Sequence, residues 1–357
     1  MHSVMDNSTT IAPSVKSLVT KINCLHLEEE WIAAKESFVS NVILAVLNMF
    51  TALTATIGNM LILLAVLRTP ALRTPSNTLL CSLAFADLLV GLVVQPTYAL
   101  QMVFEIQRNV RSFCIAKIVT TGSLSWICAG VSFLVISAIA VERLLAIKLH
   151  LRYKELVTIP RILVVAVGFW ILCSVLIIAR FLGAPYNTLV LIIVFMDVSC
   201  ITITMFAYLK IYLQIRQLQN KTRDQMHLAP PGVNISSFKR SAVTMLYIMV
   251  LFLACYIPFL STLVVRMHQG RSLRLNIIYN FTAAIVYINS SLNPFIYCFR
   301  SKDIRIAVFK LLGRKYTIDL NGDVVPVSVS TQKINSVKNS TLFQPPSPLN
   351  GLADTQL

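Results

Sequence analysis

Long apolar runs without Lys, Arg, Asp or Glu alternate with short polar segments along most of the chain. A helix needs roughly 20 apolar residues to cross about 30 Å of hydrocarbon. Most of the runs meet that length, and single acidic residues, Asp87 and Asp197, interrupt two of them. The runs cover 37–67, 74–104, 118–141, 162–179, 181–209, 241–265 and 275–299. The pattern predicts seven membrane-spanning helices.

The fourth and fifth runs are separated only by Arg180 and the segment Gly183-Ala184-Pro185-Tyr186-Asn187. Gly and Pro favour a break there, and one helix through both runs would be far longer than a bilayer is thick. Two spans with a very short loop are therefore predicted. The expected fold class is an all-α membrane protein, a seven-transmembrane helix bundle.

The chain divides into four predicted regions. Residues 1–37 form an extracellular N-terminal segment, and residues 38–299 form the seven-span domain. Residues 300–313 mix apolar and basic side chains, which predicts a short amphipathic helix on the inner leaflet and contact with its anionic lipids. Residues 314–357 are polar and aperiodic, as is typical of a disordered cytoplasmic tail.

Composition and charge fix the class and the orientation. The chain is 56% hydrophobic and 13% charged, with a net charge of +16. So apolar a chain is a poor candidate for disorder, collagen or nucleic-acid binding. With the N-terminus outside, 21 of the 31 basic residues fall on the cytoplasmic side, as the positive-inside rule requires. We expect a multi-pass plasma-membrane protein with a cytoplasmic C-terminus and a glycosylation sequon at Asn7.

Ionisable residues within spans are costly and usually functional. Asp87 lies near the middle of span two, and other spans carry oxygen-bearing side chains at matching depth. These are Asn59, Ser132, Asn289, Ser290 and Asn293. One carboxylate with several neutral oxygens suits a hard monovalent cation. The alternative is a protonated carboxyl hydrogen-bonded to a neighbouring helix.

The inner ends of spans three, six and seven carry a second set of signals. Glu142-Arg143 sits where span three meets the cytosol, and Arg143 can turn inward beside Glu142 or snorkel as a plain anchor. Pro258 and Pro294 each remove a backbone donor and are expected to kink spans six and seven. The Asn293 side chain is expected to bond the freed backbone.

Together these residues resemble the rhodopsin-like class (class A) of G-protein-coupled receptors, over roughly residues 38–313. One landmark falls in each span, in the family's order. They are Gly58-Asn59, Leu83-Ala84-Phe85-Ala86-Asp87, Glu142-Arg143, Trp170, Tyr208, Pro258 and Asn293-Pro294-Phe295-Ile296-Tyr297.

The resemblance implies an extracellular ligand and nucleotide exchange on a heterotrimeric G protein, with arrestin and a receptor kinase as further partners at the tail. It implies an activation switch formed by Glu142, Arg143, Tyr208, Phe252, Pro258, Asn293, Pro294 and Tyr297. It also implies an inhibitory sodium ion, and no other cofactor, at Asp87, Ser132, Asn289 and Asn293. The family's inner lock often has an acidic residue early in span six. Phe238-Lys239-Arg240 offers none, so some basal activity is expected.

Two departures set the chain apart from most of the family. The second extracellular loop has no cysteine, and the two extracellular cysteines are Cys24 and Cys114. Because the exterior is oxidising, we expect a Cys24–Cys114 bridge, with free thiols as the alternative. Span five has Ser199-Cys200 where the family usually has a proline. The second loop is also minimal. Both features resemble the branch of melanocortin, adenosine, cannabinoid and lysophospholipid receptors.

The ligand itself is not identified by the sequence and is expected to be a small molecule, a lipid or a peptide. Amine receptors of the family carry an acid in span three where this chain has Ser125, and opsins carry a lysine where it has Tyr287. The candidate pocket residues are Ser125, Trp126, Asp197, Tyr256 and Tyr287. Asp197 is either a counter-ion in the pocket, for a cationic ligand group or Arg180, or a polar contact between helices.

Basic residues surround the expected extracellular mouth, against Glu105 alone. They are Arg108, Arg111, Lys117, Arg180, Arg266, His268, Arg271 and Arg274. They either steer an anionic ligand or simply anchor helix ends at the interface.

The main rival function is transport or ion translocation. Transporters tend to show internal repeats, and no duplication is found in this chain. An enzyme is disfavoured because no HExxH motif or pair of catalytic aspartates is present.

Overall fold

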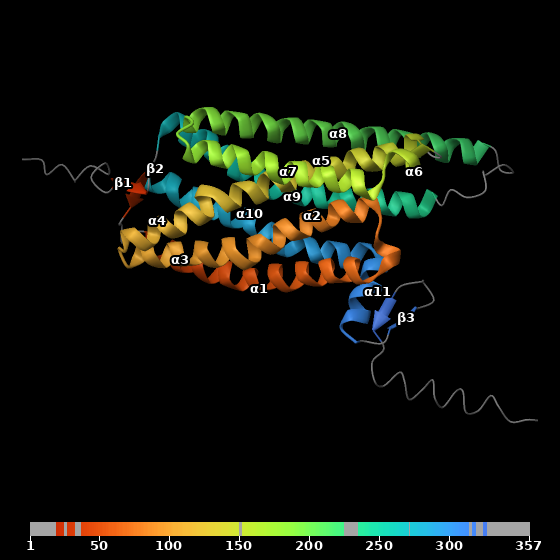
Figure 1. Ribbon diagram of the computed structural model, residues 1–357, viewed down its shortest axis with the longest axis horizontal. Helices are drawn as coiled ribbons and strands as arrows, with labels where there is room; N and C mark the ends of the chain where they lie inside the picture. Colours follow the sequence, from red (N-terminus) through yellow and green to blue (C-terminus); the bar gives the residue numbers. More distant parts are fainter. Residues whose placement is uncertain are drawn as a thin grey trace, which may run out of the picture.

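The computed structural model describes residues 19–24, 27–32, 37–149, 152–224, 235–270, 272–313, 316–318 and 324–326. Seven long helical segments lie side by side, in agreement with the predicted bundle (Figure 1). The first is α1 (Phe38–Arg68). The second joins α2 (Pro75–Leu89), η4 (Val90–Val94) and α3 (Gln95–Ile106), and the third joins α4 (Val110–Val119), η5 (Thr120–Leu124) and α5 (Ser125–Leu149). The others are α7 (Ile159–Phe181), α8 (Tyr186–Asp224), α9 (Ile235–Gln269) and α10 (Leu273–Arg300).

Six of these segments are long and apolar enough to cross a membrane when the described residues alone are considered. The seventh, α10, is more polar because it carries Asn276, Asn280, Asn289 and Asn293. The last three are buried against other helices. These polar side chains of α10 therefore lie inside the bundle.

Local sequence signals set where several helices begin and end. The Thr74 side chain accepts a hydrogen bond from the Asn77 amide, and Pro75 occupies the first turn of α2. Between α7 and α8 the chain turns at Gly183, whose φ of +98° suits glycine. The predicted break between spans four and five is therefore confirmed.

Two spans contain a π-helical turn that the sequence pattern did not predict. In the second span, η4 lies directly before Gln95-Pro96. A proline cannot donate to the preceding turn, which favours such an irregularity. In the third span, η5 holds Gly122, and the Ser125 hydroxyl donates to the Thr120 carbonyl over 2.8 Å. Side chains thus satisfy part of the altered backbone.

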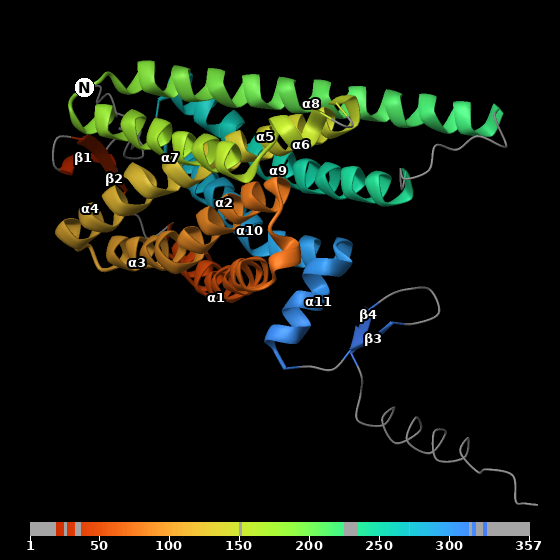
Figure 2. The same ribbon diagram turned by 45° about the vertical axis from the view of Figure 1, so that its right-hand side comes forward.

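Large apolar side chains face outward on α1, α7 and α8, as on a surface that contacts lipid. Phe50, Val164 and Phe195 are 68%, 72% and 76% exposed. At the inner end α8 and α9 continue well past the apolar runs that predicted them (Figure 2). Hydropathy marks only the part of a helix that crosses the membrane. The helix continues into water where the following residues favour helical structure.

A short helix, α11 (Lys302–Leu311), follows α10 and begins at Ser301, whose side chain accepts from the Ile304 amide. It lies within the predicted range 300–313. A four-residue helix, α6 (Tyr153–Leu156), lies in the loop between spans three and four, at the same end of the bundle (Figure 1).

Two small hairpins depart from the all-α expectation. Strands β1 (Val19–Cys24) and β2 (Leu27–Ile32) pair antiparallel before α1. Strands β3 (Tyr316–Ile318) and β4 (Val324–Pro326) pair in the segment expected to be disordered. The β-branched residues of these strands favour extended structure, and Asn321-Gly322 between the second pair is a strong hairpin signal. The other residues of 314–357 lie outside the described residues, so the predicted disorder of the tail stays a prediction.

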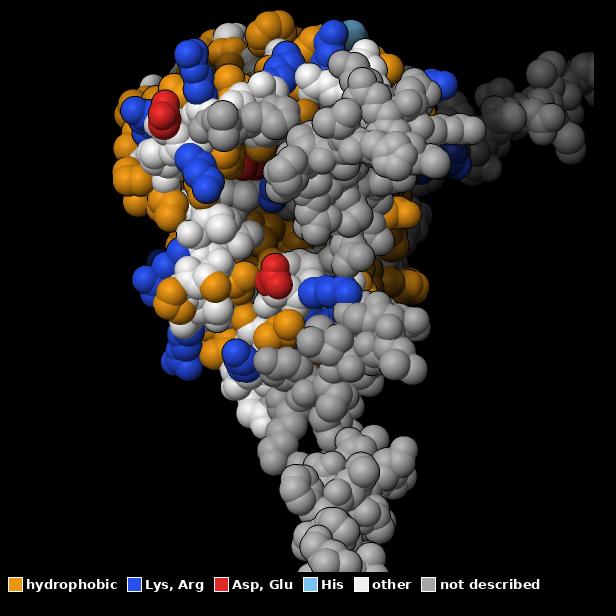
Figure 3. Space-filling model, turned by 90° about the vertical axis from the view of Figure 1, so that its right-hand side faces the viewer, with side chains coloured by type: hydrophobic (Ala, Val, Ile, Leu, Met, Phe, Trp, Pro, Cys, Tyr) orange, Lys and Arg blue, Asp and Glu red, His pale blue; other side chains and the backbone are white. Residues whose placement is uncertain are grey.

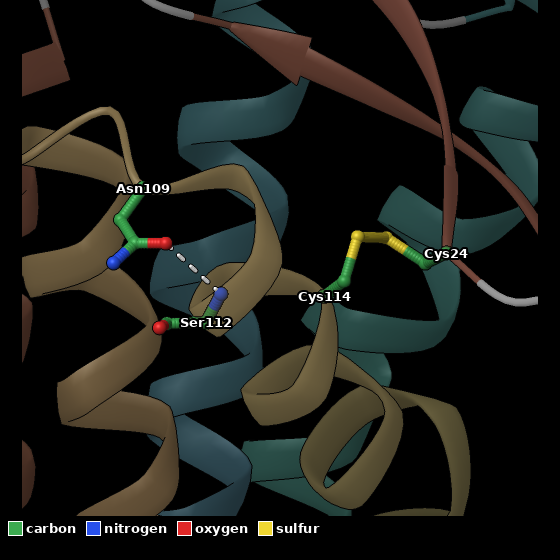
Figure 4. The surroundings of a disulfide bond; sticks show 4 residues. All are labelled: Cys24, Asn109, Ser112 and Cys114. Atoms are coloured by element: carbon green, nitrogen blue, oxygen red, sulfur yellow. Dashed lines mark hydrogen bonds between the residues drawn. A yellow bond between two sulfur atoms is a disulfide. The ribbon is translucent and has the colours of Figure 1, made fainter.

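The predicted disulfide is confirmed: Cys24 of β1 is bonded to Cys114 of α4, with Cα atoms 5.1 Å apart (Figure 4). Cys114 is held near the start of α4, where the Asn109 side chain accepts a hydrogen bond from the Ser112 amide. The bridge therefore ties the first hairpin to the top of span three. Asn7, the predicted glycosylation site, lies outside the described residues.

Candidate functional site

A cavity opens between α5, α7, α8, α9 and α10, with an empty volume of about 660 Å³ including its mouth. All five candidate pocket residues line it. They are Ser125, Trp126, Asp197, Tyr256 and Tyr287. These five residues come from four helices, and the fold brings them to one place. Their role in binding stays a prediction.

Asp197 is the one acidic or basic residue among the described side chains that line this cavity. It is 3% exposed, and its Oδ1 has no hydrogen-bond partner among the described residues. Arg180, one suggested counter-ion, instead donates from Nη1 to the Gly122 carbonyl over 3.2 Å. These contacts favour a carboxylate that faces the cavity over a satisfied contact between helices.

Aromatic rings form much of the cavity wall. Trp126 and Phe259 lie 5.9 Å apart between ring centroids, and Phe259 and Tyr279 lie 5.5 Å apart. The Arg266 guanidinium lies 4.1 Å from the centroid of the Tyr279 ring. Lys117 similarly lies 5.1 Å from the centroid of the Phe113 ring. Basic residues of the predicted rim thus have structural contacts, which favours an anchoring role; Arg271 lies outside the described residues.

A smaller cavity lies beneath the first and includes Asp87, Ser132 and Asn289, three of the four predicted sodium ligands. Asp87 is 2% exposed. The Asn289 Oδ1 is buried without a hydrogen-bond partner among the described residues. A carboxylate, a hydroxyl and a free amide oxygen form a donor set that fits a small hard cation.

Asn293, the fourth predicted ligand, is placed differently from expectation. Its Nδ2 donates to Asp87 Oδ2 over 2.7 Å instead of bonding the backbone that Pro294 frees. The freed acceptor is the carbonyl of Ser290, four residues before Pro294, and it receives Asn59 Nδ2 over 3.0 Å. Asn59 can take this role because α1 packs tightly on α10. A Cβ on Gly58 would lie only 2.8 Å from Pro294 Cγ.

Tyr256 and Tyr287 line both cavities. Tyr256 stacks on Phe252 of the predicted switch with ring centroids 4.1 Å apart, and Phe133 packs edge-on against both at 4.5 and 4.7 Å. Pro258 lies within α9, two residues beyond Tyr256. A shift of Tyr256 would therefore displace the aromatic packing between α5 and α9.

At the other end of the bundle Arg143 is held by two groups. Its Nε lies 3.5 Å from Glu142 Oε2, and its Nη2 donates to Ser76 Oγ over 2.6 Å. The Tyr153 hydroxyl donates to Glu142 Oε1. Burial, and then the contact with Glu142, raise the pKa of Tyr153 well above its ordinary value, so its hydroxyl stays a donor at neutral pH. Ser76 and Tyr153 were missed because they come from α2 and α6, and no motif marks them.

The two tyrosines predicted to join the switch are buried separately. Tyr208 packs in a small apolar cluster with Leu144 and Met249. Tyr297 is 2% exposed, and its hydroxyl has no hydrogen-bond partner among the described residues. In this arrangement neither contacts Arg143 through a hydrogen bond that the described side chains show. Lys and Arg side chains gather over this end of the molecule (Figure 3).

Six apolar helices and the more polar α10 form one bundle in the described residues, with a cavity lined by Asp197 and, at the other end, Arg143 held by Glu142 and Ser76. The model of the rhodopsin family of 7-transmembrane receptors matches residues 58–189 and 182–297. The chain therefore belongs to this family, that of rhodopsin-like G-protein-coupled receptors, and its function is that of a receptor and not of an enzyme.

Similarity to individual receptors is modest and spread over several ligand classes. The chain is 25% identical to adenosine receptor A2b of Mus musculus, over 75% of this chain and 89% of that protein. It is 27% identical to 5-hydroxytryptamine receptor 4 of Cavia porcellus, over 84% and 88%. It is 26% identical to melanocortin receptor 5 of Homo sapiens, over 69% and 77%. These relatives leave the ligand subfamily open.

Proposed function

We propose that the cavity around Asp197 takes up an extracellular ligand and that the Arg143 end promotes nucleotide exchange on a heterotrimeric G protein. The observation that carries this proposal is the shared wall of the two cavities. Tyr256 and Tyr287 face both, so a ligand in the upper cavity contacts the residues that enclose Asp87.

Coupling then follows from two-state thermodynamics. A ligand shifts an equilibrium only by its difference in affinity for the two states. A ligand that moves Tyr256 would disturb its packing with Phe252 and Phe133. Pro258 lies two residues beyond Tyr256 in α9 and marks a weak point of that helix. Movement of α9 there would open the inner end of the bundle.

In this proposal the contacts of Arg143 hold the closed arrangement. Glu142 and Ser76 hold its guanidinium toward α2 and α5, and Tyr153 steadies Glu142. Release of Arg143 would free a cation to contact a G protein. Tyr208 and Tyr297 are the predicted partners that rearrange with it.

A sodium ion is part of the proposal, because the residues around Asp87 fit one. When bound, it supplies positive charge that compensates the buried Asp87 carboxylate. Ser132 and Asn289 would hold it with Asp87, while Asn293 keeps Asp87 oriented through its 2.7 Å hydrogen bond. The ion would favour the closed state.

The orientation follows from charge. The basic end would face the cytosol, and the disulfide-linked hairpin would face the exterior of the plasma membrane. We further propose that α11 lies on the inner leaflet, where its basic residues contact anionic lipid, and that the tail is the site of receptor kinase and arrestin binding.

The test is nucleotide exchange on membranes that contain the receptor, read with several Gα subtypes. The wild-type chain is expected to exceed mock-transfected membranes, whereas Arg143→Ala should return exchange to the mock level. Lys148→Ala, which removes an exposed cation at the same end of α5, should leave exchange within about twofold. Substrate or ion transport without exchange would contradict the receptor mechanism and favour a transporter.

A further inference from the structure

The upper cavity contains a buried acid with nothing described to pair it. Asp197 is 3% exposed, and its Oδ1 has no hydrogen-bond partner among the described residues. Leaving a carboxylate in an apolar surrounding without a partner is costly. A carboxyl group in this position either takes up a proton or pairs with a cation that arrives from outside, as a charged ligand does.

The described residues that line the cavity with Asp197 are mostly aromatic and aliphatic. Trp126, Phe259 and Tyr279 form a continuous wall of rings, and no Lys, Arg or His is among the described lining residues. The Tyr279 ring already carries the Arg266 guanidinium at 4.1 Å from its centroid. Trp126 and Phe259 can pack against an apolar body, and their faces also attract a cation. An anionic ligand would instead bring a second negative charge close to Asp197.

We propose that the cavity binds a small organic amine with an aromatic or apolar body, whose protonated nitrogen pairs with Asp197. This inference rests on the proposed function, because it takes the cavity to be the ligand site. The pairing is anchored on α8.

The span-three position lacks the acid that amine receptors of the family carry there, so the amine would have to pair with span five instead. Ser125 offers a neutral hydroxyl, and that hydroxyl already donates to the Thr120 carbonyl over 2.8 Å. Asp197 is thus the anionic anchor that the described lining provides. The amine would enter with its nitrogen toward α8 and its ring against Trp126 and Phe259.

The test uses the purified full-length chain in detergent and needs no G protein. The probes are tryptamine and 2-phenylethylamine, with 2-phenylethanol and 3-phenylpropanoate as neutral and anionic analogues. Thermal stabilisation as a function of probe concentration gives the affinities. We expect the amines to stabilise the receptor and the two analogues to fail at equal concentration.

Asp197→Asn should weaken amine binding by about 30-fold or more, because it removes one partner of a buried charge pair. Asp197→Ser should give the same loss and serves if the first variant does not fold. The matched control is Glu105→Gln, since Glu105 is 7% exposed but does not line the cavity. Its amine affinities should stay within about twofold of the wild type.

Ligand-free stability gives a second test. Asp197→Asn should melt at or above the wild-type temperature, because no contact is lost. A clearly lower melting temperature would show that Asp197 is a structural contact and overturn the proposal. Equal stabilisation by the alcohol or the carboxylate, or none by the amines, would also overturn it. Nucleotide exchange is measured separately, so loss of exchange with intact amine binding would contradict only the proposed function.

Discussion

Asp87 and Asp197 are both buried aspartates in the bundle, yet their surroundings are opposite. Asp87 accepts a 2.7 Å hydrogen bond from Asn293 and shares its cavity with Ser132 and Asn289. Asp197 sits among aromatic and aliphatic side chains, with its Oδ1 unpartnered among the described residues. The protein itself supplies partners for Asp87, whereas the partner proposed for Asp197 is a ligand.

The tyrosines between the two sites make that difference functional. Tyr256 and Tyr287 belong to both cavities. A ligand that pairs with Asp197 and shifts these rings alters the space around Asp87. In such a receptor, a change in the pairing of Asp197 would change the surroundings of Asp87.

A substitution can crowd the region around Asp87 and leave the cavity around Asp197 unchanged. Gly58→Ala places a methyl group 2.8 Å from Cγ of the rigid Pro294 ring, which forces α1 from α10 near Asn293 and Asp87. We expect a loss of about 1–3 kcal/mol in the free energy of unfolding. Thermal or denaturant unfolding of the purified receptor measures it.

Gly130→Ala is the matched change in the Asp197 cavity. Its Cβ would lie 2.9 Å from the Cys173 Sγ, a side-chain atom beside open cavity space, so it should cost less than Gly58→Ala. Gly168→Ala, with nothing within 4 Å, should be neutral or stabilising. Equal losses at Gly58 and Gly168 would contradict the close α1–α10 packing.

Sodium is expected to bind at Asp87 and not at Asp197. A ligand that binds only the folded state at about tenfold its Kd adds about 1.4 kcal/mol to stability. We expect NaCl to raise the melting temperature of the receptor more than KCl at equal ionic strength. Asp87→Asn should abolish the difference and Asp197→Asn should preserve it. A sodium effect that survives Asp87→Asn would exclude this site.

The spans and the cavity residues could be predicted because both depend on local pattern. Charge-free runs marked the helices, and landmark residues fixed the register of Trp126, Asp197 and Tyr256 in their spans. Helix ends were less predictable, since α8 continues to Asp224 through polar sequence. The membrane-spanning part of a helix ends where charged residues begin, but the helix itself can continue beyond that point.

Contacts between distant segments were the part the sequence could not provide. Asn293 was expected to bond its own backbone, yet Asn59 from α1 takes that carbonyl and leaves Asn293 for Asp87. Tyr153 reaches Glu142 because α6 lies beside α5. Ser76 reaches Arg143 because the start of α2 lies there too. Such choices depend on which side chains meet after packing, and spacing along the chain does not show it.

Glu142 is a further buried acid of the bundle. Like Asp87, it has a partner within the protein. It is 3% exposed and lies 3.5 Å from Arg143, whose Nη2 donates to Ser76. Ser76→Ala removes that acceptor, and a hydrogen bond to a charged group of this kind contributes about 1.5–3 kcal/mol. Because the bond holds Arg143 in the closed arrangement, basal nucleotide exchange should rise about fivefold or more.

Ser82→Ala is the control for this change, because Ser82 lies on the same helix and accepts from Trp170 Nε1 over 3.2 Å. It removes a hydrogen bond of α2 without touching Arg143 and should leave basal exchange within about twofold. A rise of equal size in both variants would show that loosening α2 alone activates the receptor. A rise confined to Ser76→Ala would identify Arg143 as the group whose release limits activation, since only that variant removes a restraint from the guanidinium.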